Sequence, residues 1–177
     1  VSLSNDGQTL AIGAPYNQGN GSYVGHVRIY RLDANDQWIQ VGADIDGESS
    51  SDRSGHSVSL SADGQTVAIG AFMNDGDSGD INHNSGHVRI YSWNGSGWSK
   101  LGADIDGEAS NDQSGWSVSL SADGQTVAIG ALGNDGNGDI SGHVRIYSWT
   151  GSEWSQFALH HCQLPQSLRA QQDCTCR

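Results

Sequence analysis

Acidic side chains that could bind a ligand or a metal gather in two kinds of Gly- and Asn-rich connection. One kind reads "DIDGESSSDRSG" at 44–55 and "DIDGEASNDQSG" at 104–115, and the other reads "NDGDSGDINHNSG" at 74–86 and "GNDGNGDISG" at 133–142. The direction of the strands expected around them places both kinds at one end of the molecule, so the carboxylates could share one ligand-facing surface. The candidate residues are Asp46, Glu48, Asp52, Asp75, Asp77, Asp80, Asp106, Glu108, Asp112, Asp135 and Asp139.

Calcium is the metal that such carboxylates would suit, since it takes about six to eight oxygen ligands. Asp75-x-Asp77 followed by Gly79-Asp80 resembles the start of an EF-hand loop, but the distal bidentate glutamate is absent. We therefore expect at most weak calcium binding at Asp75, Asp77 and Asp80, and no other cofactor. The alternative is that Asn, Asp and Gly are simply the residues of which exposed loops are made.

Basic residues recur at fixed positions of a repeat. They are His26, His87 and His143, and Arg28, Arg89 and Arg145. Because a catalytic site would break the symmetry of a repeat, we predict structural roles for all six. Each arginine is expected between repeats, where it needs a carboxylate or carbonyl partner, with Asp44, Asp104 or Asp63 as candidates.

No arrangement of a nucleophile and a base stands out, because the serines occur in repeated "SLS" and loop contexts without a distinguished His and Asp. The chain also lacks a phosphate-binding Gly-rich loop with a lysine, and its only lysine is Lys100. We therefore expect that this segment is not an enzyme. Trp38, Trp98 and Trp154 recur as well; they could stack on sugars, but packing against outer strands is the expected use.

These residues must be positioned by a repeated unit. "VSLSADGQTVAIGA" occurs identically at 58–71 and 118–131, and a near copy opens the chain at Val1. "HSVSLS", "TVAIGA" and "HVRIYSW" alternate apolar and polar residues with a period of two, which predicts β-strands. Asp63-Gly64 suits a tight hairpin turn between the first two strands, and "WSKLGADI" alternates poorly, as expected of an outer edge strand.

Four antiparallel strands per unit predict an all-β fold built from the blades of a β-propeller. One face of each unit is aliphatic and the other is small, so each blade would bury its aliphatic face against the next. We expect about three blades, at 1–46, 55–106 and 115–158, followed by a non-repeat, disordered tail at 159–177. A β-solenoid would also repeat, but with a shorter period and without hairpin turns.

The segments "SGHSVSLSADGQTVAIGAF", "SGWSVSLSADGQTVAIGAL" and "SNDGQTLAIGAP" resemble FG-GAP repeats, the units of the propeller of integrin α-subunits. Gly55 and Gly115 correspond to the glycine of the "FG" element, and the "GAP" element is complete only at 13–15. In the calcium-binding blades of that family an Asp-rich loop joins the first two strands. Here that loop holds the single carboxylate Asp63, so the family's calcium site is not carried over.

The formal net charge of −12 argues against nucleic acid or an anionic membrane surface as a partner, and no apolar run is long enough to insert into a membrane. The resemblance implies an extracellular or cell-surface scaffold for binding or adhesion, which recognises a protein or a glycan through loops at one end. Two alternatives remain open: a propeller segment accessory to a hydrolase-type catalytic domain, or a purely structural surface repeat. Further blades or additional copies of the chain would be needed to close the propeller.

Overall fold

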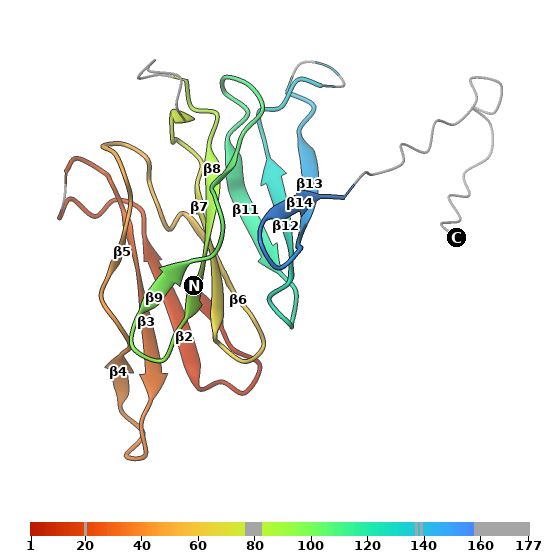
Figure 1. Cartoon of the computed structure of the whole chain (residues 1–177). Helices are drawn as coiled ribbons and strands as arrows, with labels where there is room; N and C mark the ends of the chain where they lie inside the picture. Colours follow the sequence, from red (N-terminus) through yellow and green to blue (C-terminus); the bar gives the residue numbers. More distant parts are fainter. Residues whose placement is uncertain (20, 77–82, 137, 139, 158–177) are drawn as a thin grey trace, which may run out of the picture.

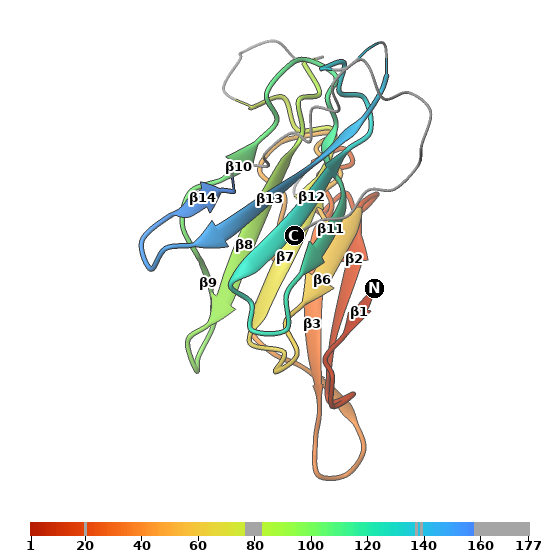
Figure 2. The same cartoon turned by 90° about the vertical axis from the view of Figure 1, so that its right-hand side faces the viewer.

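The computed structural model describes residues 1–19, 21–76, 83–136, 138 and 140–157. The described part is built entirely from antiparallel sheets, which stand side by side as three blades (Figures 1 and 2). The prediction of an all-β partial propeller is confirmed. No helix long and apolar enough to cross a membrane occurs among the described residues. The tail predicted at 159–177 lies outside them.

The strands follow the sequence repeat. Blade 1 contains β1 (Ser2–Leu3), β2 (Thr9–Ala14), β3 (His26–Leu32), β4 (Trp38–Gln40) and β5 (Ile45–Asp46). Blade 2 contains β6 (Ser57–Leu60), β7 (Thr66–Ala71), β8 (His87–Trp93), β9 (Trp98–Lys100) and β10 (Ile105–Asp106). Blade 3 contains β11 (Ser114–Leu120), β12 (Thr126–Ala131), β13 (His143–Trp149) and β14 (Trp154–Gln156). Within each blade the first four strands pair in order as a meander, and β5 and β10 pair with the third strands β3 and β8.

The outer strand of blade 2 is split into two pieces, which explains the poor alternation of "WSKLGADI". The third strand β8 pairs with β9 near its end, through Tyr91 and Lys100, and with β10 near its start, through Val88 and Ile105. Between the two pieces Gly102 adopts a φ of 82°, and a Cβ there would run into the Trp149 ring of blade 3. The break in the strand therefore lets the next blade approach.

The turn between the first two strands of each blade is fixed by its own aspartate. In blade 2 the Ser61 hydroxyl donates to Asp63 Oδ1 at 2.6 Å, the Gln65 amide donates to the same oxygen at 2.9 Å, and Gly64 adopts a φ of 65°. Asp6 and Asp123 do the same in the other blades. Because this carboxylate is used in its own turn, Asp63 does not serve as an arginine partner.

The core lies between the blades. Val27, Ile29 and Ile45 of blade 1 pack against Leu60, Val67 and Ile69 of blade 2. The equivalent residues form a second cluster between blades 2 and 3. Each blade therefore completes its hydrophobic core only by contact with a neighbour.

The connections that carry the candidate carboxylates lie together at one end of the molecule, at the top of Figure 1. The link from blade 1 to blade 2 runs beside the β2–β3 connection, where the Ser54 amide donates to the Val24 carbonyl at 3.0 Å. The next link repeats this contact, from the Ser114 amide to the Ser85 carbonyl at 2.8 Å. We call this end of the molecule the acidic rim, defined by the described residues 15–19, 21–25, 44–54, 72–76, 83–86, 104–113, 132–136, 138 and 140–142.

Candidate functional site

A buried arginine joins blade 2, and another joins blade 3, to the acidic rim of the blade before it. Arg89, on β8, is only 4% exposed; its Nη2 donates to the Asp46 carbonyl at 2.8 Å and its Nη1 lies 3.2 Å from Glu48 Oε1. Arg145, on β13, makes the same pair of contacts with the Asp106 carbonyl at 2.7 Å and with Glu108 at 3.5 Å. Both arginines thus bind one carbonyl and one carboxylate across a blade junction, and their carboxylate partners are Glu48 and Glu108 rather than Asp104.

Arg28 occupies the same repeat position on β3, but its side chain binds a residue of its own blade. Its Nη2 donates to Asp44 Oδ2 at 2.8 Å, and its side chain is 44% exposed. The hydrogen bond from Arg28 is the main reason why the pKa of Asp44 lies below its usual value. One repeat position therefore yields two buried junction residues and one surface residue.

His87 is fully enclosed at the junction of blades 1 and 2. Burial, together with the nearby positive charge of Arg89 and against the opposing effect of the Asp104 carboxylate, lowers its pKa from 6.5 to about 4. The imidazole is therefore neutral at neutral pH. One ligand atom each from His87, Glu48 and Asp104 lie within 4.8 Å of one another, as do those of His26, Asp44 and Asp46 in blade 1.

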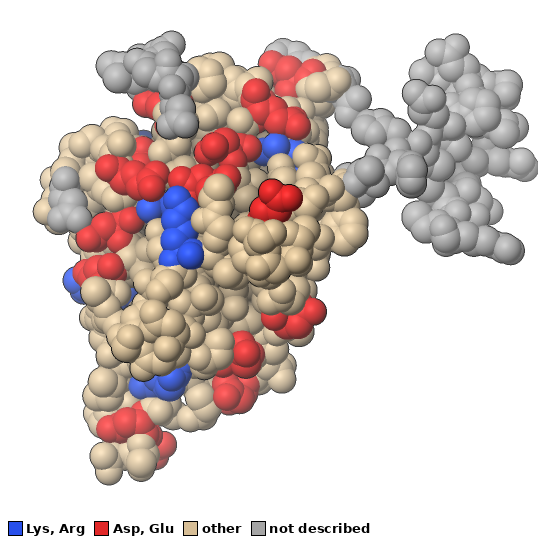
Figure 3. Space-filling model, viewed as in Figure 1, with Lys and Arg blue, Asp and Glu red and all other residues tan. Residues whose placement is uncertain are grey.

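These two clusters have the residue types of a divalent-metal site, but basic side chains of the protein already contact their carboxylates. Arg28 binds Asp44, Arg89 binds Glu48, and Lys100 contacts Asp104. Figure 3 shows Lys and Arg surrounded by Asp and Glu on this face. A metal ion would have to displace one of these basic side chains, so the clusters act first as ion-pair networks.

A groove opens beside each network, and we call these the inter-blade grooves. The first lies at the junction of blades 1 and 2 and has a volume of 370 Å³. It is lined by Ala43, Asp44, Ile45, Asp46, Tyr91, Ser96, Gly97 and Trp98. The second, of 290 Å³, lies at the junction of blades 2 and 3 and is lined by Ala103, Asp104, Ile105, Asp106, Tyr147, Glu153 and Trp154. Each groove thus combines a tyrosine, a tryptophan and two aspartates.

The tryptophans of the grooves also hold the blades together. Trp98 donates its indole Nε1–H to the Val41 carbonyl of blade 1 at 2.9 Å, and Trp154 donates to the Leu101 carbonyl of blade 2 at 2.8 Å. Burial raises the pKa of Tyr91 and of Tyr147, so both remain hydroxyl groups that can donate a hydrogen bond. Aromatic rings beside carboxylate acceptors suit a polyhydroxylated ligand, which presents C–H groups to rings and O–H groups to oxygens.

The structure separates the carboxylates that the sequence grouped together. Asp46, Glu48, Asp106 and Glu108 are exposed on the acidic rim, close to the basic residues of the junctions. Asp75 and Asp135 close their own loops by accepting from the amides of Asn84 at 2.9 Å and Ile140 at 2.7 Å. Asp77, Asp80 and Asp139 lie outside the described residues, so only Asp75 of the calcium candidates can be placed.

Asp52 and Asp112 were predicted to face a ligand, and that prediction is wrong. Both are 2% exposed. Asp52 Oδ2 accepts from the Ser49 amide at 2.8 Å, and Asp112 Oδ2 accepts from the Ala109 amide at 3.1 Å and from Asn134 Nδ2 at 3.0 Å. They fix the shape of the rim loops from inside. The identical Asp-x-Ser-Gly spacing in both links was the sequence signal for this structural role.

Comparison with known proteins agrees with the fold. Residues 99–147 match the family model of the FG-GAP repeat, and no curated protein matches the sequence. A candidate 6-phosphogluconolactonase from Bacteroides uniformis superposes with a TM-score of 0.55 at 11% identity, over 87% of this chain. The periplasmic gluconolactonase of Pseudomonas aeruginosa superposes with a TM-score of 0.51 at 20% identity, over 84% of this chain. The chain spans 38% of the length of each.

The expectation that this segment is not an enzyme is contradicted by these neighbours, because both proteins of the same fold bear the names of enzymes. The expectation rested on the missing Ser-His-Asp arrangement, which is only one of the ways in which a protein can hydrolyse a substrate. The described part of the chain therefore has the fold of a partial β-propeller, and the family model of the FG-GAP repeat matches it over residues 99–147.

Proposed function

We propose that the chain forms part of the wall of a larger β-propeller that carries or supports hydrolase-type activity on a sugar-derived substrate. We thus prefer one of the alternatives from the sequence, a propeller segment that accompanies a hydrolase-type centre, to the function of an adhesion scaffold. The likeness to the two lactonase-named propellers supports the fold of such a protein, and the chain spans 38% of the length of each.

The observation that carries the proposal is the repetition of the inter-blade groove. Two successive junctions place a tyrosine, a tryptophan and two aspartates around a space of 370 and 290 Å³. These volumes lie near the lower end of about 300–1,000 Å³ that is usual for small-molecule sites, which fits a single sugar ring. The aspartates would accept from hydroxyl groups of the ligand, and the Tyr91 hydroxyl would donate to it.

The test uses the chain and, separately, the complete protein that contains it. Hydrolysis of glucono-1,5-lactone is followed by acid release at constant pH, and binding of gluconate and of neutral monosaccharides is followed by calorimetry. We expect saturable binding by the chain and accelerated lactone opening by the complete protein. Absence of both, with protein whose folding is verified, would refute the proposal.

A charge-matched pair of variants locates the ligand. Asp46→Asn removes a carboxylate from the first groove, and we expect it to weaken binding at least about fivefold, or about 1 kcal/mol. Asp36→Asn removes the same charge from the β3–β4 hairpin at the opposite end, where a φ of 58° suits asparagine. Equal effects of the two changes would show that net charge, and not the groove, governs binding.

We also propose that the protein is exported. Its acidic composition with a single lysine supports this location, as does the periplasmic location stated for the Pseudomonas neighbour. A second candidate function is recognition of a protein or glycan partner by exposed residues of the rim, and it is compatible with catalysis elsewhere in the propeller. These residues are Asp46, Glu48, Asp106 and Glu108. Fractionation of the native host, probed with an antibody to the chain, tests the location.

A further inference from the structure

His87 is the buried member of the cluster that it forms with Glu48 and Asp104. Its side chain is 2% exposed, and its Nε2 atom has no hydrogen-bond partner among the described residues. One ligand atom of His87 lies within 4.8 Å of a carboxylate oxygen of Glu48 and of one of Asp104. A buried polar atom without a partner calls for an explanation, and a bound ion is one of the few that apply.

The equivalent histidine of blade 1 stands beside a carboxylate that is already in full use. His26 Nδ1 lies 3.5 Å from Asp44 Oδ2. Both oxygens of Asp44 accept hydrogen bonds from Arg28, at 2.9 and 2.8 Å, and Oδ1 also accepts from Gln40 at 2.7 Å. A metal ion at His26 would therefore have to break several hydrogen bonds.

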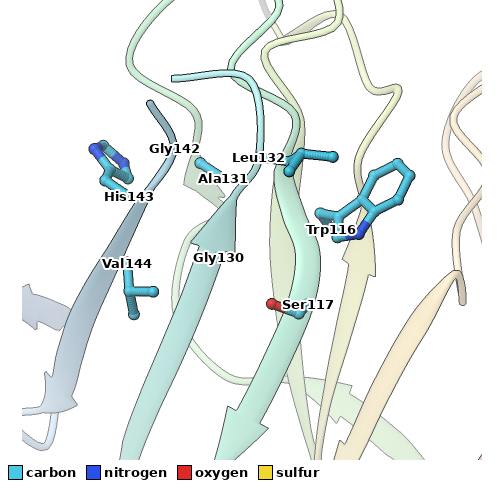
Figure 4. Close-up of a pocket in the computed structure, with 8 residues that line it drawn as sticks. All are labelled: Trp116, Ser117, Gly130, Ala131, Leu132, Gly142, His143 and Val144. Carbon is cyan, nitrogen blue, oxygen red and sulfur yellow. The ribbon is translucent and has the colours of Figure 1, made fainter. Parts of the chain in front are cut away.

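The equivalent histidine of blade 3 is less enclosed. His143 helps to line a pocket of 350 Å³ (Figure 4), and its side chain is 22% exposed. Its Nε2 lies 4.0 Å from Glu108 Oε2, and among the described residues no cluster of three possible metal ligands contains it. His87 differs from both of its equivalents, because its ring is enclosed and the Asp104 carboxylate beside it is paired with a flexible lysine.

This lysine is a departure from the repeat. Lys100 contacts Asp104, whereas Gln40 and Gln156 occupy its position in the other blades. Its side chain is 37% exposed and unbranched, so it can move into water. Arg89, by contrast, is buried and also donates to a backbone carbonyl of blade 1 at 2.8 Å. An entering metal ion would thus displace Lys100 and leave Arg89 in place.

We propose that Glu48, His87 and Asp104 bind a divalent transition metal, with Zn²⁺ as the representative ion, in exchange for Lys100. One imidazole and two carboxylates suit zinc, whereas calcium takes about six to eight oxygen ligands. Tetrahedral zinc holds its ligand atoms about 3.4 Å apart. The three ligand atoms must therefore close in by about 1 Å, and the Glu48 side chain, which is 43% exposed, has room to do so.

The metal would join two blades. Glu48 belongs to the link that follows blade 1, whereas His87 begins β8 and Asp104 precedes β10 in blade 2. Because the unfolded chain does not hold these three groups together, the ion stabilises the folded junction. At a free zinc concentration about one hundred times the Kd, the thermal midpoint should rise by about 5–11 °C.

The test measures binding of Zn²⁺ and Co²⁺ to the full 177-residue chain by calorimetry, and visible absorption reports the coordination of cobalt. Other histidines and cysteines near the end of the sequence are ligands for the same metals, so the reference chain has them replaced. Its changes are His160→Gln, His161→Gln, Cys162→Ser, Cys174→Ser and Cys176→Ser. We expect one zinc ion per reference chain with a Kd below about 10 µM, and the cobalt spectrum of a four-coordinate ion.

Variants of the reference chain locate the ion. Lys100→Gln, which installs the residue of the other two blades, should tighten zinc binding at least about tenfold because a competing charge is removed. His87→Gln should weaken it at least about hundredfold, and Glu48→Gln, at an exposed position, at least about tenfold. His26→Gln is the matched control, since it removes the equivalent buried histidine of blade 1, and it should leave the Kd within about twofold. Thermal unfolding in a chelator verifies that each variant folds.

The proposal is overturned if the reference chain shows no saturable binding of zinc or cobalt. It is also overturned if Lys100→Gln leaves the affinity unchanged, or if His26→Gln weakens binding as much as His87→Gln or Glu48→Gln does. Calcium that competes with zinc on equal terms would show a site built on oxygen alone, without His87. No sugar or lactone enters the experiment, so its result does not depend on the proposed function.

Discussion

Adding one methyl group at two equivalent glycines should separate the energy of a blade junction from that of the blade itself. Gly70 and Gly130 occupy the same position of the identical segment "VSLSADGQTVAIGA". A Cβ at either position meets the hydroxyl of a serine on the adjacent strand, Ser57 or Ser117. Only at Gly70 does it also meet the backbone carbonyl of Gly115 from the next blade.

The expected magnitudes follow from this difference. Overpacking a close contact costs about 1–3 kcal/mol, and loss of the hydrogen bond from Ser57 to Gly115 costs about 1 kcal/mol more. Alanine in place of glycine returns about 0.5–1 kcal/mol by restricting the unfolded chain. We therefore expect Gly70→Ala to lower the free energy of unfolding by about 2 kcal/mol, and Gly130→Ala to change it by less than about 0.5 kcal/mol.

Urea unfolding and thermal unfolding, both followed by tryptophan fluorescence, measure the two variants under matched conditions. Since 1 kcal/mol shifts the midpoint of thermal unfolding by about 2–4 °C in a chain of this size, the two variants should differ by about 4–8 °C. If both lose the same stability, the clash lies within the blade and the account of the junction is wrong. If neither loses any, the blades do not pack through these glycines in solution.

Three further predictions concern the junction network and the rim. Arg89→Gln should lower the free energy of unfolding by about 2 kcal/mol, because it removes the donor that binds Glu48 and the Asp46 carbonyl. Arg28→Gln, on the surface, should lower it by less than about 1 kcal/mol. Equal losses of the two variants in urea unfolding would contradict the assignment of Arg89 to the junction. His87 binds a proton with a pKa near 4 in the folded chain and 6.5 when unfolded, so stability should fall by about 3 kcal/mol as the pH drops from 6.5 to 4. His87→Gln should flatten this dependence of the urea midpoint on pH, and an unchanged slope would exclude His87 as its source. Asp112→Ala should speed hydrogen exchange at the Ala109 amide by at least about fivefold, since a buried bond of about 1 kcal/mol is lost; unchanged exchange would show that the loop is held otherwise.

The elements of the fold could be predicted because each is encoded locally. Alternation with a period of two marks "TVAIGA" and "HVRIYSW", and Asp63-Gly64 marks the turn between the first strands. The split of the outer strand could not be predicted, since its cause is the approach of the Trp149 ring to Gly102 from another blade. The period of the sequence therefore predicts the strands within a blade but not the contacts between blades.

The candidate site was harder to predict for the same reason. Asp46 and Asp52 stand six positions apart in one acidic link, yet the first is exposed and the second is buried among the amides of its loop. Arg28 and Arg89 lie in the same "HVRIY" motif, but Arg89 binds Glu48 of the preceding link, whereas Arg28 binds Asp44 of its own blade. The sequence states which charged group occupies each position, but the partner that this group binds depends on how the neighbouring blade packs.

Departures from the repeat decide which of the two inter-blade grooves is the better ligand site. In the first, Gln40 donates to Asp44 at 2.7 Å and Arg28 binds the same carboxylate. In the second, Lys100 replaces the glutamine and contacts Asp104, and Glu153 adds a carboxylate to the lining. A sugar acid would be repelled by that extra charge, and the second groove is also the smaller at 290 Å³. An acidic sugar should therefore bind at the first groove, and Glu153→Gln should bring its affinity for the second groove closer to that for the first.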